Sequence, residues 1–219
     1  LSQLKKSNKI LHTLYISPLK SLTYDIERNI VETLNEIDIN IRIDTRTGDT
    51  SNLRKKNQLL NPPNILMTTI ESFAILMSEK SAYEFFKNIK FVIIDEIHTF
   101  LNKKRGELLS LNLARLNNIS KSHKKIMLSA TIKDCDDACR YFSNKKAFLI
   151  NAKVKKKISV KILSDIHNIP WTGYTPQYAI KLIYEKLEGN TCIVFVNTRA
   201  QAELLFQNLW KINEKKLKI

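Results

Sequence analysis

Short apolar runs alternate with stretches of helical periodicity along most of the chain. The apolar runs predict strands at residues 11–17, 39–43, 65–68, 91–94 and 125–128, and an edge strand at 148–150. Apolar side chains recur at helical spacing in residues 19–34, 53–60 and 106–116, and the acidic stretch 134–137 suits the start of another helix. This alternation is typical of βαβ units, so it predicts an α/β fold around a mostly parallel sheet.

The pattern changes after a basic, polar stretch at residues 153–157, which indicates a boundary between residues 1–152 and residues 153–219. The second unit offers one predicted strand, 192–196, between two helices with apolar faces around residues 179–187 and 202–210. One strand and two helices cannot cover both faces of a sheet. We therefore expect an incomplete domain with partly exposed apolar surfaces.

Charge adds a candidate partner to this picture. Lys and Arg number 36 against 21 Asp and Glu, giving a net charge of +15, which favours a polyanion such as nucleic acid. The alternative is compositional drift, because the basic residues are spread along the chain rather than gathered in one block. No apolar run is long enough to cross a membrane, so we expect a soluble protein.

The cysteines and the N-terminus bear on the compartment. Cys135, Cys139 and Cys192 form neither an even set for disulfides nor a zinc-ligand pattern, which fits the reducing cytoplasm. The start of the chain carries no secretory signal, and its first residue is Leu1 rather than Met. We expect a cytoplasmic fragment of a longer protein.

The first chemical signal follows the apolar strand 91–94, which ends in Asp95, Glu96, Ile97 and His98. Mg²⁺-nucleotide chemistry needs one carboxylate for the ion and another to orient water, and ligands bind at the carboxyl ends of parallel strands. The alternative is that two acids and a histidine merely mark the exit from a strand.

A second signal, Ser129-Ala130-Thr131, also ends an apolar strand. Taken alone this tripeptide is a common turn. Neighbouring strand ends meet at one edge of a parallel sheet, so we expect these hydroxyl residues to lie beside the first motif and to hydrogen-bond His98.

Seven segments in order resemble the motifs of superfamily 2 DExH-box helicases: ISPLKSL at 16–22, RTGD at 46–49, TTIES at 68–72, DEIH at 95–98, KRGELL at 104–109, SAT at 129–131 and VFVNTR at 194–199. More narrowly, the chain resembles the large helicase-related group, and segments 169–179 and 197–213 resemble its ligase-associated DNA-repair type. The resemblance covers nearly the whole chain. It implies a RecA-like ATP-binding domain in residues 1–152, and a linker with the start of a second RecA-like domain in residues 153–219.

The resemblance also implies a chemistry. ATP and Mg²⁺ would be the cofactors, with Asp95 holding Mg²⁺ through water and Glu96 acting as the general base for water that attacks the γ-phosphate. His98, Ser129 and Thr131 would couple the nucleotide state to the grip on DNA.

The other motifs resemble elements that track one nucleic-acid strand. The implied contacts in the first unit are Pro18, Lys20, Arg46, Thr47, Gly48, Asp49, Thr68, Thr69, Glu71 and Ser72, and those in the second unit are Asn197, Thr198 and Arg199. Each segment also has a structural alternative, because Ser-Pro begins helices, Thr-Gly-Asp forms turns and Thr-Thr-x-Glu resembles a capping box. Asn197 to Arg199 could likewise cap a helix.

Two further groups leave the same choice open. Lys103, Lys104 and Arg105 could touch DNA, although a basic cluster before a glycine is more often a solvated loop. Trp171 and Tyr174 could stack on a base, although packing at a domain interface is the commoner role of such aromatics.

One helicase element is missing from these 219 residues. The four glycines are Gly48, Gly106, Gly173 and Gly189, and none belongs to a phosphate-binding loop of the form GxxxxGK followed by Ser or Thr. By the resemblance that loop would lie upstream of Leu1, and the arginine finger would lie downstream of Ile219. Ile70 stands where the family usually has Pro. We expect little ATP hydrolysis by this chain alone, and a separate chain carrying the missing motifs is a candidate partner.

Three hypotheses follow. The first is a segment of an ATP-dependent helicase that translocates 3′ to 5′ on single-stranded DNA and unwinds duplexes in DNA repair, as the resemblance implies. The second is a nonenzymatic nucleic-acid-binding module. The third is a remnant of a truncated gene without a selected activity.

Overall fold

The computed structural model describes residues 10–37, 41–132, 135–142, 147–151, 159–161 and 179–213. The chain divides into two compact units, residues 1–151 and 152–219, which are described separately below. None of the helices in these described ranges combines the length and apolar character that a membrane span requires.

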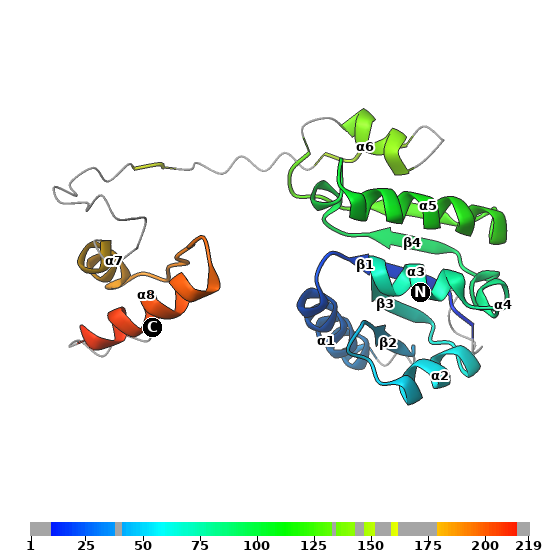
Figure 1. Cartoon of the computed structure of the whole chain (residues 1–219), viewed down its shortest axis with the longest axis horizontal. Coiled ribbons are helices and arrows are strands. Elements are labelled where there is room, and N and C mark those ends of the chain that lie inside the picture. The colour runs from blue at the N-terminus through cyan, green and yellow to red at the C-terminus, as the bar shows by residue number, and fades with distance from the viewer. Residues whose placement is uncertain are drawn as a thin grey trace. The chain divides into compact units, whose positions relative to one another are not determined.

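The first unit is built on a five-stranded parallel sheet (Figure 1). Its strands are β1 (Thr13–Ser17), β2 (Ile43–Arg46), β3 (Ile65–Thr69), β4 (Phe91–Ile94) and β5 (Lys124–Met127), in the spatial order β2-β3-β1-β4-β5. Successive strands are parallel, so each connection must cross over the sheet and carries a helix. This is the predicted α/β class.

Strand register places the main core on one face of the sheet. Leu14 of β1 is paired with Leu66 of β3 and Val92 of β4, and Ile16 is paired with Ile94, so these side chains point the same way. They join one buried cluster with side chains from α3 (Ile70–Ser78), α4 (Ala82–Phe86) and α5 (Lys104–Ile119).

The remaining helices complete the first unit. Helix α1 (Lys20–Glu36) packs on β1, β2 and β3, and its buried Leu34 lies outside the cluster just described, as expected for a helix on the opposite face. Helices α2 (Asn52–Leu60) and α6 (Cys135–Phe142) and a 3-10 helix (Ile97–Thr99) complete the set. Helices therefore cover both faces, as predicted.

The second unit contains α7 (Ile180–Leu187) and α8 (Arg199–Lys211). The two helices are in contact, and the Tyr184 hydroxyl donates to Asn213 Oδ1 at 3.2 Å. Apolar side chains between the helices are exposed, most of all Phe195 at 88% and Ile193 at 80%. The expectation of exposed apolar surface is met in the described part of this unit.

Three predicted strands need correction. The strand expected at 39–43 lies instead at Ile43–Arg46, with residues 39–40 outside the described ranges. Residues 148–150 and 192–196 are described, but neither segment is a strand. Their apolar sequence fits a strand, yet a strand exists only where a neighbour pairs its N–H and C=O groups, and the described residues provide none for these segments.

Candidate functional site

The parallel sheet brings the predicted motifs to one edge. Register pairs Ser17 with Thr69, Arg46 with Thr68 and Ile94 with Met127, so the segments that follow β1, β2, β3, β4 and β5 all leave the sheet at its carboxyl end. In open parallel sheets this edge is where ligands bind.

Hydrogen bonds join the segment after β4 to the segment after β5. The backbone N–H of Ile97 donates to the Leu128 carbonyl at 3.0 Å, and His98 Nδ1 lies 2.8 Å from Ser129 Oγ. The Ser129 hydroxyl is also 3.2 Å from the Thr131 carbonyl, while the Thr131 side chain is exposed. The predicted proximity of the Asp-Glu-Ile-His and Ser-Ala-Thr segments is thus present in the structure.

Both carboxylate oxygens of Asp95 accept hydrogen bonds. Oδ1 accepts the backbone N–H of Glu96 at 2.9 Å, and Oδ2 accepts the hydroxyl of Tyr15 at 2.8 Å. Burial and the hydrogen bond to Asp95 raise the pKa of Tyr15 above its ordinary value, so the phenol keeps its proton and remains a donor. This contact fixes the orientation of the Asp95 carboxylate.

Sequence reasoning missed Tyr15. The available signal was one hydroxyl-bearing aromatic residue between Leu14 and Ile16 in a predicted strand. Its significance depends on register, because Tyr15 is paired with Ile93, whose side chain projects to the same face as that of Asp95 two residues later. The sequence does not specify which strand lies beside β4.

Glu96 has an unusual backbone and an unpartnered oxygen. It adopts the left-handed conformation (φ 49°, ψ 47°), which is uncommon for a residue with a Cβ and tends to occur at functional sites. Its Oε2 is buried and lacks a hydrogen bond in the described part of the chain. That oxygen lies 3.1 Å from His98 Nδ1. The same nitrogen lies closer to Ser129 Oγ, at 2.8 Å.

Comparison with known proteins identifies the family of the chain. The model of the DEAD/DEAH box helicase family matches residues 1–138. The chain belongs to the DEAD/DEAH box helicase family.

Relatives of this helicase chain point to one group within the family. It is 37% identical to the ATP-dependent helicase Lhr-Core of Methanocaldococcus jannaschii, over 93% of this chain and 26% of that protein. It is 30% identical to the Lhr helicase/uracil glycosylase of Escherichia coli, over 94% of this chain and 15% of that protein. The chain therefore spans 26% or less of the length of these relatives and has the character of an Lhr-type segment.

A solved structure supports the same fold. The structure of Mycobacterium smegmatis helicase Lhr bound to ssDNA and AMP-PNP has a TM-score of 0.77 and 28% sequence identity. The match covers 96% of this chain and 29% of that chain. The sheet and its helices are those of a RecA-like helicase core.

The carboxylates after β4 can be compared with the needs of a Mg²⁺-nucleotide site. Asp95 and Glu96 supply two carboxylates, and the buried Oε2 of Glu96 can still accept a hydrogen bond from water. Within the described residues, His, Cys, Asp and Glu form no group of three or more that could hold a metal ion. Mg²⁺ bound with a nucleotide commonly takes only one or two protein carboxylates, and phosphates and water complete its shell, so these residues fit that role.

The predicted strand contacts of the first unit fall into two classes. The exposed residues are Lys20, Gly48, Asp49 and Glu71, and the buried residues are Pro18, Arg46, Thr47, Thr68, Thr69 and Ser72. Buried side chains here hold the loops in shape. Arg46 Nη1 donates to the Lys55 carbonyl at 3.0 Å, and the Thr68 hydroxyl donates to the Arg46 carbonyl at 2.8 Å.

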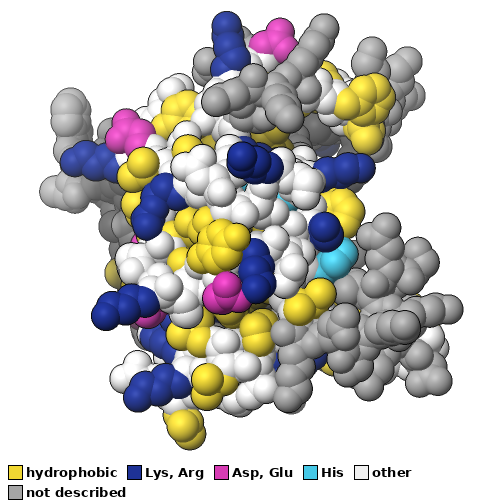
Figure 2. Space-filling view, turned by 90° about the vertical axis from the view of Figure 1, so that its right-hand side faces the viewer, with side chains coloured by type: hydrophobic (Ala, Val, Ile, Leu, Met, Phe, Trp, Pro, Cys, Tyr) yellow, Lys and Arg dark blue, Asp and Glu magenta, His cyan; other side chains and the backbone are white. Residues whose placement is uncertain are grey.

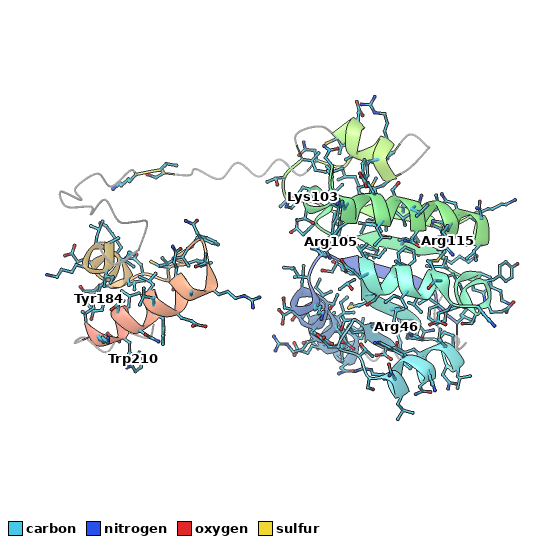
Figure 3. The ribbon with its side chains drawn as sticks, viewed as in Figure 1. Arg46, Lys103, Arg105, Arg115, Tyr184 and Trp210 are labelled. Atoms are coloured by element: carbon cyan, nitrogen blue, oxygen red, sulfur yellow. The ribbon has the colours of Figure 1, made fainter. Side chains whose placement is uncertain are left out.

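Charge at this edge is already partly paired. Lys20 Nζ lies 2.7 Å from Asp49 Oδ1 in an exposed ion pair, and Lys55 Nζ donates to the Gly48 carbonyl at 3.3 Å. In Figure 3, Lys103 and Arg105 lie together near the start of α5, and Arg46 lies below them. In Figure 2 the Lys and Arg side chains are spread over the visible face rather than gathered in one block.

In the second unit, Thr198 is the N-cap of α8. Its side chain accepts the backbone N–H of Gln201 at 3.2 Å, and Gln201 Oε1 accepts the backbone N–H of Asn197 at 3.1 Å. The capping alternative for this segment is therefore present in the structure, and a role of Asn197, Thr198 and Arg199 in gripping DNA stays a prediction. Trp171 and Tyr174 lie outside the described residues.

A first prediction concerns Tyr15→Phe. Removing the hydroxyl leaves Asp95 Oδ2 without its donor, so the carboxylate loses its fixed orientation while the ring still fills its place. One lost hydrogen bond to a charged group is worth about 1.5–3 kcal/mol, so the Mg²⁺ concentration for half-maximal nucleotide binding should rise about tenfold or more. Titrating Mg²⁺ against a fluorescent ATP analogue measures this in a chimera of Lhr-Core that carries these residues.

A matched control exists for this variant. Tyr83 is exposed on α4, and Tyr83→Phe should leave the Mg²⁺ requirement unchanged. Equal Mg²⁺ titrations for Tyr15→Phe and the parent protein would show that the Tyr15 contact does not position Asp95.

Proposed function

We propose that this chain is the part of a DNA helicase motor that reads the nucleotide state and contacts one DNA strand. In this proposal the motor hydrolyses ATP with Mg²⁺, translocates on single-stranded DNA and unwinds duplexes. The observation that carries the proposal is the 2.8 Å contact between His98 and Ser129, because it joins the segment bearing the two carboxylates to the neighbouring strand end. A role in DNA repair rests on the resemblance to the ligase-associated type.

The roles of the chain's own residues follow from this geometry. Bound nucleotide supplies the phosphates and, with Mg²⁺, the charge neutralisation that phosphoryl transfer requires. Asp95 is held in orientation by Tyr15 and accepts hydrogen bonds from the water around the ion. Glu96 stands next in the chain, with an oxygen free to orient and deprotonate the attacking water.

His98 and Ser129 make the connection to the strand track. A change in water or phosphate beside Glu96 reaches His98, whose nitrogen lies close to both Glu96 and Ser129. Ser129 then contacts the Thr131 carbonyl, so the loop after β5 can respond to the nucleotide. Exposed Lys20 and backbone amides at the other strand ends hold phosphates without reading sequence.

The test is a Ser129→Ala variant in a chimera where these 219 residues replace the matched segment of M. jannaschii Lhr-Core. If Ser129 couples the two sites, ATP hydrolysis should stay within about threefold of the parent, while unwinding of a tailed duplex should fall about tenfold, as expected for loss of one half-buried hydrogen bond. Ser122→Ala, at an exposed position before β5, is the matched control. Parallel loss of both activities, or of neither, contradicts the coupling role.

The alternative function is nonenzymatic binding of nucleic acid, and it differs from the motor proposal in one forecast. The charge of +15 is the observation that favours it. Both functions predict binding to labelled oligo(dT) that weakens as salt rises, because phosphate contacts release counterions. Only the motor proposal predicts that nucleotide binding changes the DNA affinity of the chimera.

A further inference from the structure

One guanidinium at the start of α5 contacts three separate segments. Arg105 Nε lies 2.7 Å from Glu71 Oε1, and its Nη2 lies 3.3 Å from Glu71 Oε2, a two-point ion pair. The same Nη2 donates to the Pro18 carbonyl at 3.0 Å. The guanidinium carbon also lies 5.7 Å from the centre of the Phe100 ring.

These contacts join segments that are far apart in the sequence. Pro18 follows β1, and Glu71 lies in the first turn of α3. Arg105, labelled in Figure 3, lies in the first turn of α5. The first two segments carry implied strand contacts. A planar guanidinium binds both oxygens of a carboxylate through two parallel N–H groups and still has a donor for a carbonyl. The ammonium group of a lysine lacks this two-point geometry.

The start of α5 is held close to Phe100. Gly106 follows Arg105, and a Cβ at this glycine would lie 2.1 Å from the Phe100 carbonyl oxygen. Because only glycine permits this approach, the position of Arg105 is set by buried backbone rather than by a mobile surface loop. Phe100 itself is fully buried.

The charge of Glu71 is hard to reconcile with a direct phosphate contact. A carboxylate repels phosphate, and here both of its oxygens are engaged by Arg105. Burial raises the pKa of Glu71, but the hydrogen bonds from Arg105 and neighbouring groups outweigh burial and leave it below the ordinary value. Glu71 therefore stays ionised and paired.

We propose that Glu71 and Arg105 are positioning residues whose ion pair, together with the Pro18 carbonyl, fixes the spacing of the strand-contacting segments after β1 and β3. The inference rests on the proposed function, since it assigns a role within the same DNA-contacting edge. It replaces the expectation that Glu71 itself touches DNA, and it gives Arg105 a role other than a solvated loop.

The alternative is that Arg105 binds phosphate directly and Glu71 merely neutralises it. The two readings predict opposite signs for Glu71→Gln. Direct contact predicts tighter DNA binding, because a negative charge is removed and Arg105 is released. A positioning pair predicts weaker binding despite the removal of that charge.

The experiment measures anisotropy of labelled oligo(dT) with the full 219-residue chain. Glu71→Gln, Arg105→Gln and Arg105→Lys should each weaken binding about twofold to fivefold, the upper part of the range for one ion pair at the surface. The double variant Glu71→Gln/Arg105→Gln should bind no more weakly than Arg105→Gln alone. Lys121→Gln removes a charge near the opposite edge of the sheet and should change affinity less than twofold.

A second measurement keeps this inference separate from the proposed function. Hydrogen exchange of the backbone amides in residues 23–26 and 73–76, the first that can donate within α1 and α3, should speed up in Glu71→Gln and Arg105→Gln, while amides of β1 and β4 stay protected. Failure of the parent chain to bind oligo(dT) would refute the DNA role, yet faster exchange in the variants would still show that the Glu71–Arg105 ion pair positions these segments. Tighter DNA binding by Glu71→Gln, or unchanged exchange in both variants, would overturn it.

Discussion

A glutamine in place of Glu96 should leave nucleotide and strand binding intact and lower ATP hydrolysis by about 10²- to 10⁴-fold, the usual range for loss of a general base. Glutamine keeps the size of the side chain and an oxygen that can accept from water, but it cannot take a proton. Glu96 Oε2 lies 3.1 Å from His98 Nδ1, and glutamine can keep a polar atom at this position. We expect the largest functional effect of any single substitution at this position.

Phosphate release by the chimera with Lhr-Core, measured with saturating single-stranded DNA, checks this effect. Glu107→Gln is the matched control, because Glu107 is exposed in the first turn of α5 and should be neutral. Turnover of Glu96→Gln within threefold of the parent would remove Glu96 from the catalytic role. The purified 219-residue chain should show little turnover with either residue, because it contains no phosphate-binding loop of the GxxxxGK form.

Gly106→Ala should cause the largest loss of stability. In most helices this change gains about 1 kcal/mol from helix propensity. Here the new Cβ would meet the Phe100 carbonyl oxygen at 2.1 Å and its carbon at 2.9 Å, and these are backbone atoms that cannot rotate away. Overpacking of this kind costs about 1–3 kcal/mol, and a contact as short as 2.1 Å belongs at the upper end of that range, so we expect a net loss of up to about 2 kcal/mol.

Urea unfolding followed by circular dichroism measures this loss as a lower midpoint at an unchanged slope. Gly48→Ala is the control, since the nearest atom to its added Cβ is the flexible end of Lys20 at 3.4 Å, and its midpoint should hardly move. A midpoint for Gly106→Ala equal to or above that of the parent would show that α5 can start elsewhere. Such a result would also weaken the argument that Gly106 fixes Arg105.

Much of the first unit could be predicted from apolar runs. The run 91–94 is observed as β4, the predicted run 65–68 lacks the last residue of β3, and the predicted run 125–128 lies one residue later than β5. β3 and β4 have a neighbouring strand on each side and consist of apolar residues apart from the two threonines of β3, so composition alone indicates them. β5 is an edge strand that begins with two lysines, and its prediction is displaced by one residue. β2 is an edge strand and mixes Asp44 and Arg46 with apolar residues, which explains its displaced prediction.

Short and unpaired segments escaped the same reasoning. Helix α4 is five residues long, less than two turns, so its apolar residues show no helical period. The segment 192–196 has the composition of a strand, yet pairing depends on residues remote in sequence. Patterns of local composition contain no information about such partners.

The same distinction applies to the site. The meeting of the Asp-Glu-Ile-His and Ser-Ala-Thr segments was predictable, because carboxyl ends of parallel strands share one edge. The contact of Tyr15 with Asp95 and the ion pair of Arg105 with Glu71 were not predictable, because each depends on which strands and helices are neighbours. Residues such as Arg46 and Thr68 have side chains that usually contact phosphates, and only the structure shows them buried in hydrogen bonds within the protein.

The left-handed backbone at Glu96 lowers the stability of the fold at the residue that the proposed function needs as a base. For a residue with a Cβ this conformation costs about 1–2 kcal/mol, a penalty that glycine escapes and asparagine lessens. Selection for heat resistance alone would therefore favour glycine at position 96, and selection for turnover would keep an acid there. Substitutions intended to raise the stability of this chain should therefore spare Glu96 and be made at other positions.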